Sequence, residues 1–160
     1  MDRLESMLQL QVEAADKIQV DPRTIHDLEE RVQYFKDMIL AAMNELHEAL
    51  DESSWKPWKT EQFINENEAF GELRDAWQFI MNAMFVATGM QPRELADKLF
   101  VEHARKIVLN IQRAETGEAP KCPQCKRALD EIEVKEVRAA STQRVDIHCV
   151  CGVYLGSRVV

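Results

Sequence analysis

Two pairs of acidic residues have the types and the spacing needed to hold a metal ion. Glu45 and Glu48 stand three residues apart, and Glu72 and Asp75 repeat this spacing further along the chain. Residues three apart are neighbours on one side of a helix, although one such pair alone would also suit a solvated helix face. Two matching pairs on facing helices bring together four carboxylates, which repel one another unless cations neutralise them. Because oxygen ligands suit hard cations, we predict that all four acids bind Mg²⁺ or Mn²⁺.

The four cysteines form a second set of candidate metal ligands. Cys122 and Cys125 belong to a Cys-Pro-Gln-Cys motif, and Cys149 and Cys151 flank a single valine. Four clustered thiolates are a typical tetrahedral zinc site, and a site filled by four protein ligands is structural rather than catalytic. The second motif has only one residue between its cysteines, so His148 is an alternative ligand to Cys149 or Cys151.

A set of long helices must position the acids. Apolar residues recur at helical spacing from Met1 to about Glu115, and this region has few turn signals. We expect four helices in a bundle, because four amphipathic helices with short connections bury their apolar stripes in this way. The first helix ends before Asp21, the second opens at Pro22 or Arg23 and continues to about Leu50, the third extends from near Glu61 to Gly89, and the fourth starts at Pro92.

The pattern changes after the fourth helix. Residues 114–121 are polar, contain a glycine and a proline, and indicate a linker. Short alternating runs at 132–134 and 145–147 predict strands between the cysteine motifs. The predicted fold is therefore mainly α, with a four-helix-type bundle at 1–115, a linker at 116–121 and a small β zinc ribbon at 122–160.

Composition limits the classes of partner. The sequence has 28 acidic and 20 basic residues, a net charge of −8, which argues against nucleic acid as a partner. No N-terminal stretch has the pattern of a leader, and no apolar segment approaches the roughly 20 residues of a membrane span. We expect a cytoplasmic protein with no membrane partner.

Several motifs together resemble one superfamily. The acid pairs, in the order Glu-x-x-Glu then Glu-x-x-Asp, look like the signature of the all-α nucleoside triphosphate pyrophosphatases, which include MazG and the dimeric dUTPases. The loop at 55–59 (WKPWK) is similar to their aromatic and lysine loop, and the helix that contains Gln11 resembles their first motif. Lys106, Asn110 and Arg113 match the spacing of the basic motif on their last helix. The resemblance covers about residues 5–117.

The resemblance implies a reaction and a set of roles. The expected activity is Mg²⁺-dependent hydrolysis of a nucleoside triphosphate to the monophosphate and diphosphate, with Glu45 or Glu48 as the base. A homodimer or homotetramer is expected, since the helical region has more apolar positions than four helices shield and relatives build the site between subunits. The residues expected to bind substrate are Gln11, Trp55, Lys56, Trp58, Lys59, Lys106, Asn110 and Arg113.

The identity of the base divides the hypotheses. Ala15 and Ala114 stand where dimeric dUTPases typically have asparagine and glutamine, and Glu118 replaces a tyrosine. We rank dUTP first and a purine deoxynucleotide (dGTP or dATP) second, the latter in a MazG-like enzyme that shapes the dNTP pool, for example of a phage. The alternative of another class is a non-catalytic zinc-ribbon adaptor. A di-iron bundle would need Glu-x-x-His pairs, which are absent.

Overall fold

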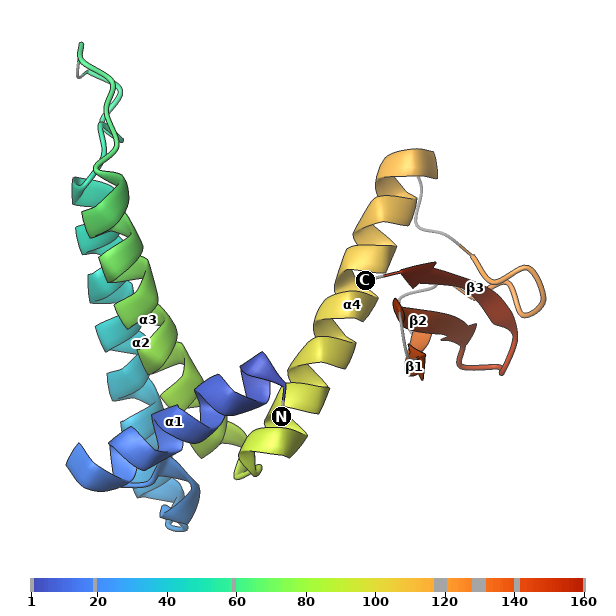
Figure 1. Ribbon diagram of the computed structural model, residues 1–160, viewed down its shortest axis with the longest axis horizontal. Helices are drawn as coiled ribbons and strands as arrows, with labels where there is room; N and C mark the ends of the chain where they lie inside the picture. The colour runs from blue at the N-terminus through green and yellow to red at the C-terminus, as the bar shows by residue number, and fades with distance from the viewer. Residues whose placement is uncertain are drawn as a thin grey trace. The chain divides into compact units, whose positions relative to one another are not determined.

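The protein folds into helices followed by a small sheet. The computed structural model describes residues 2–18, 20–58, 60–116, 121–127, 132–139 and 142–159. The chain forms two compact units, Met1–Ala96 and Asp97–Val160. Figure 1 shows their helices and strands, coloured from blue at the N-terminus to red at the C-terminus. The predicted mainly α fold, with four long helices and a small C-terminal β structure, is confirmed. Within the described residues, no helix is both long and apolar enough to cross a membrane.

An antiparallel helix pair is the main feature of the first unit. Helices α2 (Leu28–Asp51) and α3 (Glu66–Thr88) pack along each other. The sequence predicted that α2 starts at Pro22 or Arg23, and this is wrong. Residues Pro22–Thr24 form the short 3₁₀ helix η1, and Asp27 caps α2 by accepting hydrogen bonds from the backbone N–H groups of the first turn.

The ends of α3 are set by different local contacts. The helix begins at Glu66, later than the predicted position near Glu61, because Ser53 and Ile64 form an antiparallel bridge at the base of the connecting loop. It ends at Gly89 as predicted, where a φ of 66° gives the left-handed conformation that glycine adopts without steric cost. Arg31 of α2 donates to the Val86 carbonyl at 3.0 and 3.2 Å, which satisfies an acceptor at this helix end.

Helix α1 (Arg3–Ile18) packs against α3. Figure 1 shows it crossing the hairpin near the end that carries Thr88, away from the loop between α2 and α3. Leu8 and Val12 are buried on α1, and Met81, Phe85 and Val86 are buried on α3. This packing leaves one face of α1 available to line a site beside α3.

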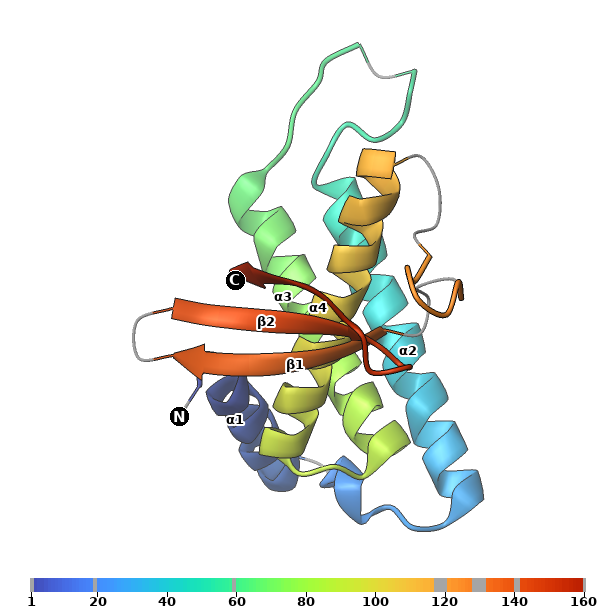
Figure 2. The same cartoon turned by 90° about the vertical axis from the view of Figure 1, so that its right-hand side faces the viewer.

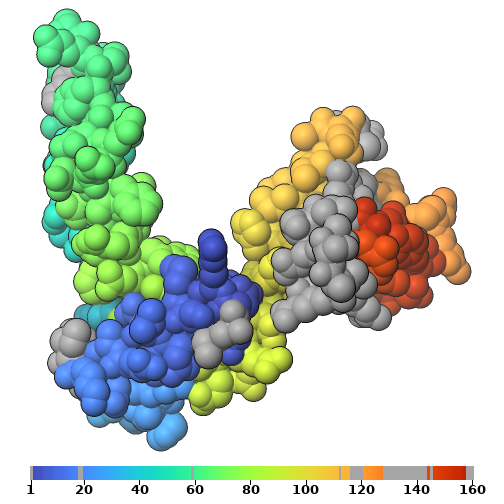
Figure 3. All heavy atoms as spheres, viewed as in Figure 1, coloured from blue at the N-terminus to red at the C-terminus, as the bar shows by residue number. Residues whose placement is uncertain are grey.

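A stripe of apolar residues on α2 lies outside the packed interface. Met38 and Ala42 are buried, whereas the residues of the stripe are between 40% and 71% exposed. Figure 3 shows that the upper part of the hairpin stands clear of the other described elements of this unit. Large contiguous apolar surfaces of this kind mark interaction sites. The stripe consists of Leu28, Val32, Phe35, Met43, Leu46 and Leu50.

The second unit combines most of α4 (Pro92–Thr116) with a three-stranded antiparallel sheet. The sheet has the order β1-β2-β3, visible in Figure 2, with bounds Ile132–Ala139, Thr142–Cys149 and Tyr154–Val159. Residues 104, 108 and 109 of α4 share its hydrophobic core with Ile147 and with two of the cysteines. The two compact units divide within α4. The predicted linker 116–121 lies mostly outside the described residues.

Candidate functional site

Three of the four predicted metal ligands come together on the α2/α3 hairpin. Glu45 on α2 and Glu72 and Asp75 on α3 each offer a carboxylate oxygen, and these oxygens lie within 4.8 Å of one another. All three side chains are half-buried. The small buried residues Ala42 and Ala76 adjoin the acids along their helices, and small side chains permit close helix approach. The arrangement suits a hard divalent cation bound by oxygen.

The pKa of Glu72 is raised by its neighbours. Its hydrogen bond with the Glu45 carboxyl group is the largest cause, because that bond requires a proton. Desolvation and the negative charges of Glu48, Glu45 and Asp75 act in the same direction. A cation at this position would replace the shared proton as the source of neutralising charge.

The fourth predicted ligand, Glu48, lies outside this cluster. Among the described residues, the group of acids close enough to share an ion contains only Glu45, Glu72 and Asp75. The Glu48 side chain is exposed and accepts a hydrogen bond from the Asn44 amide one turn earlier. Its charge nevertheless contributes to the raised pKa of Glu72.

Asp75 is already partly neutralised by its own helix. Arg74 Nε lies 3.0 Å from Asp75 Oδ1, and the Arg74 guanidinium holds the pKa of Asp75 below its ordinary value. Gln78 Nε2 also donates to Asp75 Oδ1, at 3.1 Å. Asp75 therefore remains ionised and ready to bind a cation.

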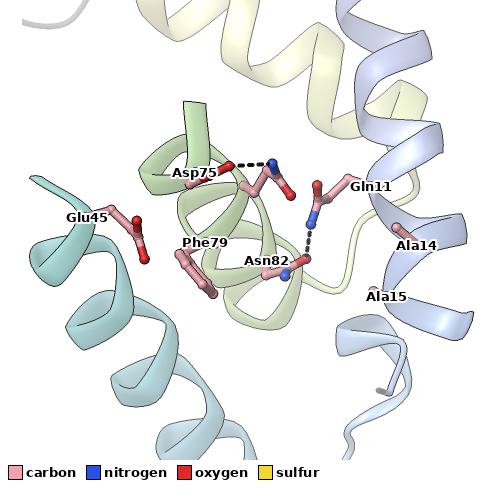
Figure 4. Close-up of a pocket in the computed structure, with 8 residues that line it drawn as sticks. Gln11, Ala14, Ala15, Glu45, Asp75, Phe79 and Asn82 are labelled. Carbon is pink, nitrogen blue, oxygen red and sulfur yellow. Dashed lines mark hydrogen bonds between the residues drawn. The ribbon is translucent and has the colours of Figure 1, made fainter. Parts of the chain in front are cut away.

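A pocket of about 270 Å³ adjoins two of the acids. Gln11 of α1, which the sequence predicted to bind substrate, is among the residues that line it, and its Nε2 donates to Asn82 Oδ1 at 3.1 Å. Figure 4 shows Gln11 pointing toward Asn82 from α1 and Glu45 pointing toward α3 from α2. The pocket is lined by Gln11, Ala14, Ala15, Glu45, Asp75, Gln78, Phe79 and Asn82.

The sequence analysis missed Gln78, Phe79 and Asn82. Asn82 is only 9% exposed, and it is the one buried polar side chain among the described residues. A signal was available, because Asn82 follows Asp75 by seven residues, or two helical turns, and so lies on the same face of α3. Extending the acidic stripe along this face would have found it.

The loop between α2 and α3 is closed by its own contacts. Glu52 accepts hydrogen bonds from the backbone and side chain of Asn65 at its base. Trp55 donates to Asp51 at 3.3 Å, and Lys56 Nζ lies 5.3 Å from the centre of the Trp55 ring. Trp58 is 74% exposed. Trp55, Lys56 and Trp58 were predicted to bind substrate, but none of the three lines the pocket beside Asn82. Lys59, predicted with them, lies outside the described residues.

The predicted basic motif is on α4, in the second unit. Lys106 and Arg113 line a shallow pocket of about 190 Å³ together with Arg105. Asn110 is exposed on the same helix and does not line this pocket. Glu102 and Leu109 also line the pocket, and Glu102 lies 3.6 Å from the Arg105 guanidinium. The three basic side chains outnumber this one carboxylate, and basic side chains suit phosphate oxygens.

The four cysteines also come together, as predicted. Cys122 Sγ lies 3.7 Å from Cys151 Sγ, and Cys125 Sγ lies 3.6 Å from Cys149 Sγ. All four sulfur atoms lie within 4.8 Å of one another, and all four cysteines are free. Within the described residues this group does not include His148, whose ring contacts Tyr154 with centroids 5.5 Å apart. Four such thiols can bind a metal ion.

The electrostatics of the thiols are unequal. The pKa of Cys122 is lowered to about 6, and the largest cause is the hydrogen bond that its sulfur accepts from the Cys125 backbone N–H. The Cys151 backbone N–H lowers the pKa of Cys149, but desolvation and hydrogen bonds with the other three thiols outweigh it and raise this pKa to about 12. Without a cation, all four sulfurs cannot ionise together at neutral pH.

The chain was compared with family models, curated proteins and solved structures, and one family model matches it. Neither the curated proteins nor the solved structures include a match to the chain. The family model described as dUTPase matches residues 3–140, which contain the acid cluster, the adjoining pocket and the first cysteine motif. Because that match covers most of its length, the chain belongs to the dUTPase family.

Proposed function

We propose that the protein is a Mg²⁺-dependent nucleoside triphosphate pyrophosphohydrolase that acts on a deoxynucleotide. Family membership makes it a nucleotide pyrophosphatase-like hydrolase. The observation that carries the finer proposal is the position of the acid cluster, since Glu45 and Asp75 belong both to the cluster and to the pocket. A cation held there would lie directly beside a bound nucleotide.

Each residue of the cluster has a role in this proposal. Glu45, Glu72 and Asp75 hold Mg²⁺ or Mn²⁺, which would neutralise the triphosphate and lower the pKa of a bound water. Glu48 lies near the cluster but outside it, so its carboxylate is available to accept a proton from that water. Glu45 is the alternative base. The resemblance to the superfamily implies that Lys106, Asn110, Arg113 and the loop lysines bind the phosphates, and their ammonium, amide and guanidinium groups are chemically suited to that role.

The base enters the pocket beside α1 in this proposal. Phe79 offers an aromatic ring, and the Gln11–Asn82 pair offers amide groups for hydrogen bonds to a base edge. Ala15 has a short side chain where relatives typically have asparagine, which leaves space in the pocket. We rank dUTP first and a purine deoxynucleotide second.

The proposed assembly is a homodimer or a dimer of dimers. The apolar stripe from Leu28 to Leu50 extends along most of α2, and its side chains remain exposed among the described residues of the first unit. A second copy would bury it, and self-complementary contact between copies is the commonest way to do so.

The test is pyrophosphate release from dUTP with and without Mg²⁺. Glu72→Gln removes one carboxylate of the cluster and should reduce the rate at least about a hundredfold, the scale expected when a metal ligand is lost. Glu68→Gln is the matched control, because Glu68 is exposed one turn earlier on α3 and lies outside the cluster. A non-catalytic adaptor would release no pyrophosphate from any nucleotide, and that result would overturn the proposal.

A further inference from the structure

The cysteine cluster has the dimensions of a metal site. For a tetrahedral zinc ion with Zn–S distances of about 2.3 Å, the sulfurs are about 3.8 Å apart. The two Sγ–Sγ distances, 3.7 Å for Cys122–Cys151 and 3.6 Å for Cys125–Cys149, are close to this value. A disulfide would need a sulfur separation of about 2.05 Å. We propose that the four cysteines bind one zinc ion, and that this ion completes the core that holds α4 against the sheet.

The two cysteine motifs form related turns despite their different lengths. In the first, Cys122 N–H donates to the Arg127 carbonyl at 2.9 Å, and in the second, Cys149 N–H donates to the Val153 carbonyl at 2.9 Å. Each turn contains a left-handed residue directly after its second cysteine, Lys126 with φ 61° and Gly152 with φ 90°. The second motif is thus a shortened version of the first turn, and both present their sulfurs to one point.

Backbone donors prepare the site for thiolates. Cys125 N–H points to Cys122 Sγ at an N···S distance of 3.5 Å. Hydrogen bonds of this kind favour the ionised sulfur, which is the form that binds metal. Thiolate ligands select zinc over hard cations, and four of them leave no open coordination position. The proposed zinc is therefore structural and separate from the Mg²⁺ of the acid cluster.

The ligands belong to the same core as α4. Cys122 is 0% and Cys149 is 1% exposed, and they cluster with Ala104, Val108 and Leu109 of the helix. Ile147 of β2 is also a buried member of this cluster. Because two of the ligands are themselves members of this core, metal binding would supply folding free energy to the packing of α4 on the sheet. Loss of zinc should release this part of α4.

A consequence for nucleotide binding rests on the proposed function. Ala104 and Val108 face the core, and Leu109 belongs to the core while also lining the pocket that contains Lys106 and Arg113. Lys106, Asn110 and Arg113 themselves are exposed. Zinc would then support the residues proposed to bind phosphate without touching substrate itself.

The metal arm of the experiment uses the full-length chain and no nucleotide. Elemental analysis of the purified protein should find one zinc per chain, and replacement by Co²⁺ should give the visible absorption of tetrahedral thiolate coordination. Cys151→Ser removes an exposed ligand and no buried side chain. Loss of zinc in this variant therefore reports the missing thiolate rather than a cavity made in the core. His148→Ala is the matched control and should keep one zinc. Zinc-free protein without cobalt–thiolate absorption would overturn the proposal.

The packing arm measures amide hydrogen exchange. Removal of zinc with a chelator should speed exchange at 104–109 of α4 by about tenfold or more, because these amides are then protected only by local structure. Exchange at 38–42 of α2, in the first unit, should not change and serves as the internal control. Unchanged exchange in α4 after complete zinc loss would refute the role of the ion in the core. A zinc protein that passes both arms but hydrolyses no nucleotide would refute only the proposed function.

Discussion

Replacing Asn82 with leucine tests whether the buried amide reads the base. Leucine is similar in size, so the substitution removes the hydrogen bond to Gln11 Nε2 at 3.1 Å without opening a large cavity. Gln11 is half-buried and lines the pocket, so its amide can turn to water. The substitution should therefore lower the free energy of unfolding by about 1 kcal/mol, the contribution of one ordinary hydrogen bond. This loss corresponds to a fall in Tm of about 2–4 °C.

The effect on selectivity should be larger than the effect on stability. If the Asn82 amide contacts the base, the variant loses that hydrogen bond in the transition state, and discrimination between bases should fall by about tenfold to a hundredfold. The assay is kcat/KM for each common dNTP at fixed Mg²⁺. Gln9→Leu is the control, since Gln9 is exposed on α1 and does not line the pocket.

Two results of this experiment would distinguish a base-reading role of Asn82 from a purely structural one. A flattened order of bases with a Tm lowered by a few degrees would support base reading. An unchanged order with the same loss of Tm would refute it, because the Gln11–Asn82 pair would then only tie α1 to α3.

Three further outcomes are expected. Glu48→Gln and Asp75→Asn should each lower the rate of pyrophosphate release at least about a hundredfold, and near-normal rates in both would contradict the roles proposed for them. Light scattering should show that the protein is a dimer or tetramer. Val32 is 43% exposed on the apolar stripe, so Val32→Glu should place a charge in the interface and shift the protein toward monomer. A wild-type monomer at micromolar concentration would exclude this assembly. The hydrogen-bonded ion pair with Arg23 lowers the pKa of Asp21. The pair therefore stabilises the folded protein at pH values above 3.8, the ordinary pKa of an aspartate, and this stabilisation is lost as the pH falls through the lowered pKa. Asp21→Asn should therefore lower the Tm at pH 7 but have little effect in strong acid, and an equal loss at both pH values would argue against the ion pair.

Local sequence signals determined most of the helices and the donor atoms of the two candidate metal sites. Gly89 ends α3 and Pro92 begins α4 as predicted, because left-handed backbone and a missing N–H are properties of single residues. The spacing of the acids and of the cysteines was sufficient to select oxygen and sulfur chemistry. Helix starts were less accurate, since Asp21 and Asp27 both offer a capping carboxylate and only one of them opens α2.

Tertiary structure decided which of these residues meet. Glu45 and Glu48 have the same local pattern, yet only Glu45 joins Glu72 and Asp75, because convergence depends on how α2 is rotated and shifted against α3. The same rotation buries Met38 and Ala42 and leaves the larger stripe from Leu28 to Leu50 exposed. The contact between Gln11 and Asn82 joins residues 71 positions apart. Periodicity within one helix cannot specify such a pairing, because it depends on the packing of side chains from two helices at once.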